Sequence, residues 1–190
     1  MTTSWSNYRL ASNRGVPLTL NLLLLGALAF IPKTALASSS CFGNPTVTVS
    51  ATGVSFGSYD VMNAVATPGT GSVTVSATCP FSNLPVIVNY SIALNTGSSG
   101  IFTPRTMSSG TNKLQYNLYT SVSYTSVWGD GTGGTQTVSD QINGTCQYQF
   151  FGIGITCSGS QNDTLYGNLP GMQNVAAGSY SDTITVTVNF

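Results

Sequence analysis

The chain of 190 residues contains no histidine and no glutamate, and only 5% of its residues are charged. Histidine is the usual base that activates a serine or cysteine nucleophile, and it is the commonest metal ligand. The acidic residues are five separated aspartates: Asp60, Asp130, Asp140, Asp163 and Asp182. The composition therefore predicts no catalytic residue, no metal site and no cofactor. One enzymatic alternative remains, a hydrolase in which two aspartates meet in space.

Basic residues are also scarce, and beyond residue 37 only Arg105 and Lys113 are present. Two positive and five negative charges give residues 38–190 a net charge near −3 (2 − 5 = −3). Because there is no basic patch, nucleic acid is not an expected partner. So few charges give little electrostatic repulsion between protein molecules, and association is therefore weakly opposed. A protein that assembles with other chains could tolerate this.

The first 37 residues have the pattern of a signal peptide. Arg9 and Arg14 precede an apolar run from Leu18 to Ile31, which is too short to span a membrane. Ala35-Leu36-Ala37 is an A-x-A cleavage site, so we expect cleavage before Ser38 and contact with a membrane only during export. An uncleaved anchor is the alternative. Residues 38–190 would then form one domain, since they show no internal repeat and no linker.

Four cysteines remain after the expected cleavage: Cys41, Cys79, Cys146 and Cys157. An even number in an exported protein predicts two disulfides. Three pairings are possible, and we predict Cys41–Cys79 together with Cys146–Cys157. Zinc ligation is disfavoured because the spacing is not C-x₂-C and histidine is absent.

Residues 38–190 are rich in strand-forming residues, and short turns of Gly, Asn, Ser and Asp interrupt them. Apolar and polar residues alternate over Val86–Leu94, over Lys113–Ser121 and over Tyr180–Phe190, where the sequence ends. A strand over Ser123–Trp128 is expected before the turn residues Gly129-Asp130-Gly131. Strands at this spacing, without helices, predict an all-β sandwich or barrel.

Six short motifs resemble those of one family. They are Phe56-Gly57-Ser58-Tyr59-Asp60, Arg105-Thr106-Met107, Leu114-Gln115-Tyr116-Asn117-Leu118-Tyr119, Trp128-Gly129-Asp130-Gly131, Leu165-Tyr166-Gly167 and Gly178-Ser179-Tyr180-Ser181-Asp182. In this order they are similar to the spore coat protein U domain family, which includes the Csu-type subunits of archaic chaperone–usher pili. The resemblance covers nearly all of residues 38–190.

The resemblance implies an immunoglobulin-like β-sandwich that lacks its final strand. Such a sandwich has an open groove beside its last strand, with unpaired backbone groups and exposed apolar side chains. Ile184, Val186, Val188 and Phe190 would line this strand-acceptor groove. The alternative is that Tyr180–Phe190 is an ordinary internal strand of a complete sandwich.

The resemblance also implies partners for that groove. A periplasmic chaperone would supply a strand first, and a neighbouring pilus subunit would replace it at the outer-membrane usher, by strand addition. The subunit would reach the periplasm and then the cell surface, in a pilus or secreted. A polymerising subunit must also lend a strand, yet only Ser38-Ser39-Ser40 precede Cys41. We therefore expect a subunit that accepts but does not lend a strand, as at a pilus tip, unless Pro45–Ser50 is a short donor.

The segment between the last two cysteines, CQYQFFGIGITC, is not part of the family pattern. Its apolar residues are Tyr148, Phe150, Phe151, Ile153 and Ile155. Phe150 and Phe151 are adjacent, so in a strand they would point to opposite faces and one would be exposed. We expect an adhesive loop here, with a structural hairpin as the alternative.

The sequence thus predicts a structural and adhesive pilus subunit, assembled by donor-strand complementation and involved in surface attachment and biofilm formation. A stand-alone secreted β-sandwich that binds a ligand, for example a carbohydrate, is the second prediction. Genes for a chaperone and an usher beside this one would separate the two.

Overall fold

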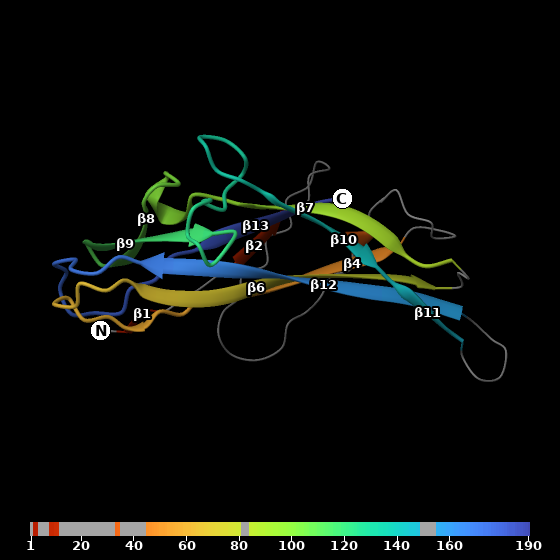
Figure 1. Cartoon of the computed structure of the whole chain (residues 1–190), viewed down its shortest axis with the longest axis horizontal. Coiled ribbons are helices and arrows are strands. Elements are labelled where there is room, and N and C mark those ends of the chain that lie inside the picture. Colours follow the sequence, from red (N-terminus) through yellow and green to blue (C-terminus); the bar gives the residue numbers. More distant parts are fainter. Residues whose placement is uncertain (1, 4–7, 12–32, 35–44, 81–83, 149–154) are drawn as a thin grey trace.

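The computed structural model describes residues 2–3, 8–11, 33–34, 45–80, 84–148 and 155–190. Within these ranges the chain forms β-strands and one short 3₁₀ turn, η1 (Gly97–Ser99), and no α-helix. Most strands run along the long axis of the molecule (Figure 1). The all-β prediction is therefore confirmed.

The larger sheet has seven strands. Its order is β3 (Lys33–Thr34), β4 (Thr46–Thr52), β6 (Thr67–Pro80), β12 (Ile155–Leu169), β9 (Asn112–Tyr119) and β8 (Arg105–Ser109), with β11 (Thr145–Tyr148) also paired to β12. The centre of the sheet is the long antiparallel pair of β6 and β12, in register from Pro80 opposite Thr156 to Thr67 opposite Leu169.

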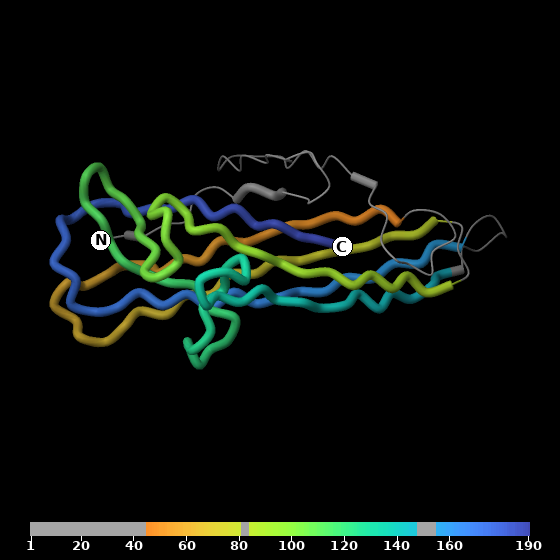
Figure 2. The backbone as a smooth tube through the Cα atoms, turned by 90° about the horizontal axis from the view of Figure 1, so that it is seen from above, coloured from red at the N-terminus to blue at the C-terminus, as the bar shows by residue number. Residues whose placement is uncertain are grey.

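The smaller sheet has four strands, in the order β10 (Val138–Asn143), β7 (Ile87–Leu94), β13 (Ile184–Asn189) and β2 (Tyr8–Ala11). A separate pair joins β1 (Thr2–Thr3) to β5 (Gly57–Ser58). The segment between β9 and β10 projects sideways as a lobe when the molecule is seen from above (Figure 2).

The core lies between the two sheets and follows the period-2 pattern of the strands. From the smaller sheet, Val88 and Ile92 of β7 are fully buried. From the larger sheet, Val73 and Val75 of β6 and Leu114 of β9 are also fully buried. The two faces enclose one continuous apolar cluster, which is the arrangement of a β-sandwich.

Gly144 is the corner at which the chain passes from one sheet to the other. It separates β10, which pairs with β7, from β11, which pairs with β12. A Cβ atom on Gly144 would collide with the Val86 side chain and lie 2.7 Å from the Ser158 carbonyl oxygen. Only glycine allows so close an approach of the two sheets.

The structure corrects one predicted strand and adds another. Ser123–Trp128 is not a strand, because it makes only an isolated bridge between Tyr119 and Val127 and another from Trp128 to Gln136. β8 was not expected from the sequence, because its first residue, Arg105, is charged and nevertheless faces inward.

The predicted Cys146–Cys157 disulfide is confirmed. The two residues lie directly opposite each other on β11 and β12, with an S–S distance of 2.05 Å. Cys79 is also disulfide-bonded. Its expected partner, Cys41, lies outside the described residues, so that pairing stays a prediction.

Candidate functional site

The two edges of β13 have very different neighbours. On one side β13 pairs antiparallel with β7, from Val186 opposite Leu94 to Asn189 opposite Ser91. On the other side, among the described residues, it pairs only with β2, a parallel strand of four residues that ends at Ala11 opposite Thr187. β2 belongs to the segment expected to be removed as a signal peptide. The side of β13 away from β7 is thus a position that accepts an additional strand.

The alternation predicted for the last strand is observed in β13. Ile184 and Val186 are fully buried and Val188 is 3% exposed, whereas Thr185 and Thr187 are half-buried on the other face. Phe190 follows the strand and packs against the core while remaining partly exposed. Three of the four residues predicted for the groove, Ile184, Val186 and Val188, therefore face the core along one strand, and Phe190 lies just beyond its end. Their role in accepting a foreign strand stays a prediction.

The residues predicted for an adhesive loop are only partly described. Phe150, Phe151 and Ile153 lie outside the described residues, in the connection between β11 and β12. Tyr148 is the last residue of β11. Ile155 is the first residue of β12 and packs against the core while remaining partly exposed, so its place in an adhesive surface stays a prediction. The disulfide closes the base of this hairpin, at the right-hand end of Figure 1.

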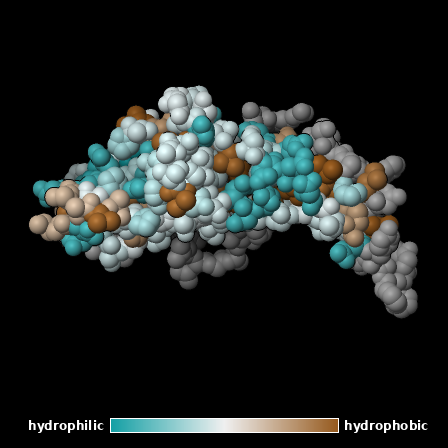
Figure 3. All heavy atoms as spheres, viewed as in Figure 1, coloured by the Kyte–Doolittle hydropathy of each residue, from teal (hydrophilic) through white to brown (hydrophobic). Residues whose placement is uncertain are grey.

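Sequence reasoning missed an exposed apolar surface at the opposite end of the sandwich. Met62, Val65 and Met172 are 81%, 70% and 68% exposed. The loops that carry them are joined by a hydrogen bond from the Met172 amide to the Asn63 carbonyl oxygen, 2.9 Å. Several spheres at the left-hand end of Figure 3 are brown or tan, the colours of apolar residues. No sequence pattern marks this surface, because its residues come from two distant loops.

Four of the six family motifs contribute to a buried polar cluster around Arg105, and the other two pack beside it. The Arg105 guanidinium donates to the carbonyl oxygens of Asn95 and Trp128 and to Asn117 Oδ1, over distances of 2.7 to 3.1 Å. Nearby, Tyr116 Oη donates to Asp182 Oδ2 (2.6 Å). The Tyr116 ring meets Phe56 edge-on, and Phe56 in turn lies against Gly167. The motifs therefore build the core of the sandwich.

Burial disfavours the charged form of Arg105 and lowers its pKa to about 10, partly offset by Tyr116 and Asp182. The guanidinium is consequently still charged at neutral pH. Its hydrogen bonds go to neutral oxygens, so it fixes three chain segments and is not available to bind a ligand.

The structure places Asp140 and Asp163 near each other and near Tyr90. Tyr90 Oη donates to Asp163 Oδ2 over 2.7 Å, and Asp163 is only 8% exposed. Asp140 accepts hydrogen bonds from the Gln141 amide (2.7 Å) and from Gln161 Nε2 (2.8 Å). Both carboxylates are thus engaged with neighbouring donors. The described residues contain no group of three potential metal ligands.

We expect Asp163→Asn to stabilise the protein at neutral pH. Burial raises the pKa of Asp163 above its ordinary 3.8, as does the charge of Asp140, while the bond from Tyr90 partly opposes this. A raised carboxyl pKa in the folded state contributes stability below pH 3.8, and this contribution is lost as pH rises through the folded-state pKa. Asparagine keeps an acceptor for Tyr90 and cannot ionise.

Thermal unfolding of the parent and of Asp163→Asn between pH 4 and pH 8 measures this effect. The variant should melt a few degrees higher at pH 7, and the difference should vanish toward pH 4. Asp60→Asn, a change of an exposed aspartate, is the control and should melt like the parent. A variant that is less stable than the parent at pH 7 would contradict the assignment.

Comparison with known proteins supports the motif analysis. A profile of the Spore Coat Protein U domain matches residues 29–187. Protein U of Myxococcus xanthus is 31% identical over 144 residues, covering 72% of this chain and 71% of the relative. The expected apolar run and cleavage site of the signal peptide lie outside the described residues, and among described residues no helix is long and apolar enough to cross a membrane.

One solved structure is similar to this chain, the CsuC–CsuE chaperone–tip adhesion subunit pre-assembly complex from archaic chaperone–usher Csu pili of Acinetobacter baumannii. The similarity has a TM-score of 0.41 and 22% identity, over 77% of this chain and 40% of the solved chain. The chain thus spans less than half of that solved chain. The profile match over most of the sequence and the identity to Protein U show that this chain belongs to the spore coat protein U domain family.

Proposed function

We propose that this protein is a structural subunit of a chaperone–usher pilus and that β13 forms its strand-acceptor groove. The observation that carries the proposal is the edge of β13, where, in the part of the chain that the structure describes, only the four residues of β2 provide a second neighbour. If residues 1–37 are removed at export, β2 is lost and this edge keeps unpaired N–H and C=O groups. Such an edge requires a strand from another chain.

The proposed partners follow from this edge. A periplasmic chaperone would occupy it first, and a neighbouring subunit would replace the chaperone at the outer-membrane usher. The role is structural and not catalytic, since the family relationship points to assembly. Export to the periplasm and then to the cell surface is part of the same proposal.

We further propose that the subunit accepts a strand without lending one. Pro45–Ser50 is the segment expected as a possible short donor, and from Thr46 onward it is part of β4 and pairs with β6 of the same domain. With cleavage before Ser38, no other alternating segment precedes β4. This supports a position at the tip of the pilus.

The first experiment compares folding with and without a supplied strand. Residues 38–190 are expressed in a bacterial periplasm, alone and with a candidate pilus chaperone, and the yield and thermal midpoint are recorded. We expect recovery only with the chaperone. The matched control is a chaperone whose donated strand carries aspartate at its apolar positions, and it should fail to rescue the subunit.

A chain that is soluble, monomeric and cooperatively folded without a partner would contradict the proposal. The sandwich would then be complete without a lent strand, and a stand-alone binding domain would explain the family fold better.

We propose that attachment to surfaces, and through it biofilm formation, uses the apolar side chains of the disulfide-closed hairpin. The double substitution Phe150→Ser and Phe151→Ser should abolish attachment of piliated cells to a hydrophobic surface and leave the thermal midpoint of the subunit unchanged. The matched control is Met62→Ser with Met172→Ser at the opposite end of the sandwich, which should attach like the parent. Attachment that survives the phenylalanine changes would refute this role of the hairpin. If attachment is lost only in the methionine variant, the adhesive surface lies at the opposite end of the sandwich.

A further inference from the structure

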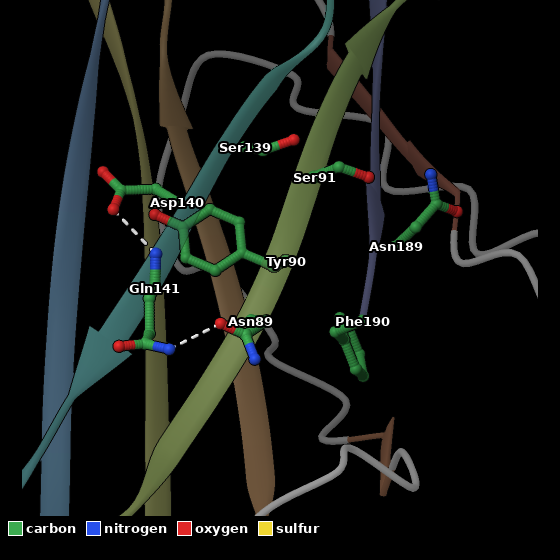
Figure 4. A pocket seen from close by; sticks show the side chains of 8 residues that line it. All are labelled: Asn89, Tyr90, Ser91, Ser139, Asp140, Gln141, Asn189 and Phe190. Atoms are coloured by element: carbon green, nitrogen blue, oxygen red, sulfur yellow. Dashed lines mark hydrogen bonds between the residues drawn. The ribbon is translucent and has the colours of Figure 1, made fainter.

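A shallow depression lies on the smaller sheet, across β10, β7 and β13 (Figure 4). Its volume is about 650 Å³, within the range of small-molecule sites. The residues used below are Asn89, Ser91, Ser139, Gln141, Asn189 and Phe190. Apart from Phe190, they occupy strand positions that alternate with the buried residues, so the depression is distinct from the apolar groove on the inner face of β13.

The strand register explains the shape of the depression. Asn189, Ser91 and Ser139 form one row across β13, β7 and β10. Asn89 and Gln141 form the next row, directly opposite each other. The two serines are short and make a low floor, while the longer amide side chains and Phe190 stand around it.

Several polar groups in the depression have no partner. Gln141 Nε2 donates to Asn89 Oδ1 over 2.6 Å, which leaves Asn89 Nδ2 and Gln141 Oε1 unbonded among the described residues. The hydroxyls of Ser91 and Ser139 are likewise unbonded within the described part of the chain. Asn189 Oδ1 is buried and has no hydrogen-bond partner among the described residues. A buried acceptor without a donor is rare and costs stability, so a ligand donor here would be favourable.

The charge around the depression selects the class of ligand. Among the described residues no lysine or arginine lines it, which disfavours phosphate, sulfate and anionic polymers. Its one acidic residue, Asp140, already accepts two hydrogen bonds, from the Gln141 amide and from Gln161. What remains are neutral donors and acceptors beside one aromatic ring. Such a set matches a polyhydroxylated neutral molecule with an apolar C–H face.

We propose that this depression binds a neutral saccharide, whose hydroxyls would bond to Asn89, Gln141, Ser91 and Asn189 while one sugar face packs on Phe190. Its polar residues alternate with the buried ones and so do not depend on the proposed strand exchange, whereas Phe190 is shared with the proposed groove. A saccharide could bind to a subunit within a pilus or to a free-standing domain.

Calorimetric titration with four neutral hexasaccharides, of glucose (cellohexaose and maltohexaose), mannose and N-acetylglucosamine, tests the proposal. The protein is the exported chain in the form in which it is recovered, with or without a partner strand, so the result is independent of the strand experiment. We expect at least one hexasaccharide to bind. Ser91→Leu, which fills the floor, and the double variant Asn89→Ala with Gln141→Ala should each weaken binding tenfold or more.

Ser76→Leu is the matched control, because Ser76 is a half-buried serine on β6 of the larger sheet, away from the depression. It should bind like the parent. Three results would overturn the proposal: no hexasaccharide binds to the folded protein, binding survives both depression variants, or binding is lost equally in Ser76→Leu. Binding of an anionic polymer such as alginate, without binding of any neutral sugar, would also refute it.

Discussion

Replacement of Arg105 by methionine should lower the free energy of unfolding by about 3–5 kcal/mol. Methionine fills much of the volume and removes the cost of burying a charge. It cannot donate hydrogen bonds, so the carbonyl oxygen of Trp128 would be left buried and unpaired, and the part-buried carbonyl oxygen of Asn95 would lose its two bonds. Each unpaired acceptor costs about 1–3 kcal/mol, which outweighs the gain.

Chemical denaturation of the recovered subunit measures this loss. Arg105→Lys should have an intermediate effect, because it keeps the charge but not the planar fork that reaches three segments. Lys113→Met is the control. Lys113 is exposed and bonds only Ser108 Oγ, so its loss should change the stability by less than about 0.5 kcal/mol. Equal stability of the Arg105→Met and Lys113→Met variants would show that the Arg105 cluster is not a structural centre.

Two substitutions one residue apart on β13 should have opposite outcomes. Val186 is fully buried opposite Leu94, so Val186→Asp would place a charge in the core and prevent folding even with a chaperone strand. Thr187 is half-buried on the other face, opposite Ala93. Thr187→Asp should therefore be recovered with the chaperone at close to the parent yield.

Periplasmic yield and thermal midpoint measured with the candidate chaperone distinguish these outcomes. The comparison tests whether the groove uses only the inward face of β13, because both variants introduce the same charge on the same strand and differ only in the face. If Thr187→Asp is as damaging as Val186→Asp, the outer face of β13 is also covered in the assembled state. Recovery of a stable Val186→Asp variant would contradict the inward register of the strand.

The positions of the polar interior could not be predicted from the sequence. Arg105, Asp163 and Asp182 are all buried, although charged residues are normally found at the surface. Each is buried because its partners come from other parts of the chain: Trp128 for Arg105, Tyr90 for Asp163 and Tyr116 for Asp182. No local pattern indicates such partners. The strand β8 was missed for the same reason, since Arg105 looked like a surface residue.

The candidate site also combines features that the sequence predicted with features that only the structure shows. The alternation of Ile184, Val186 and Val188 was sufficient to predict the strand and its buried face. That β13 has only β2 on its outer side depends on strand order, which local sequence does not specify. The row of Asn189, Ser91 and Ser139 requires the register of three strands that are distant in the chain.

The sequence by itself determined the all-β class, the buried faces of β7 and β13, the Cys146–Cys157 disulfide and the family, since period-2 alternation, cysteine number and short motifs are local properties. Only the tertiary structure decided the crossing between sheets at Gly144, the burial of Arg105 and the pairing of β13 with the short strand β2 on its side away from β7. These features depend on which distant strands become neighbours, and that choice results from packing the whole core and satisfying its buried polar groups together.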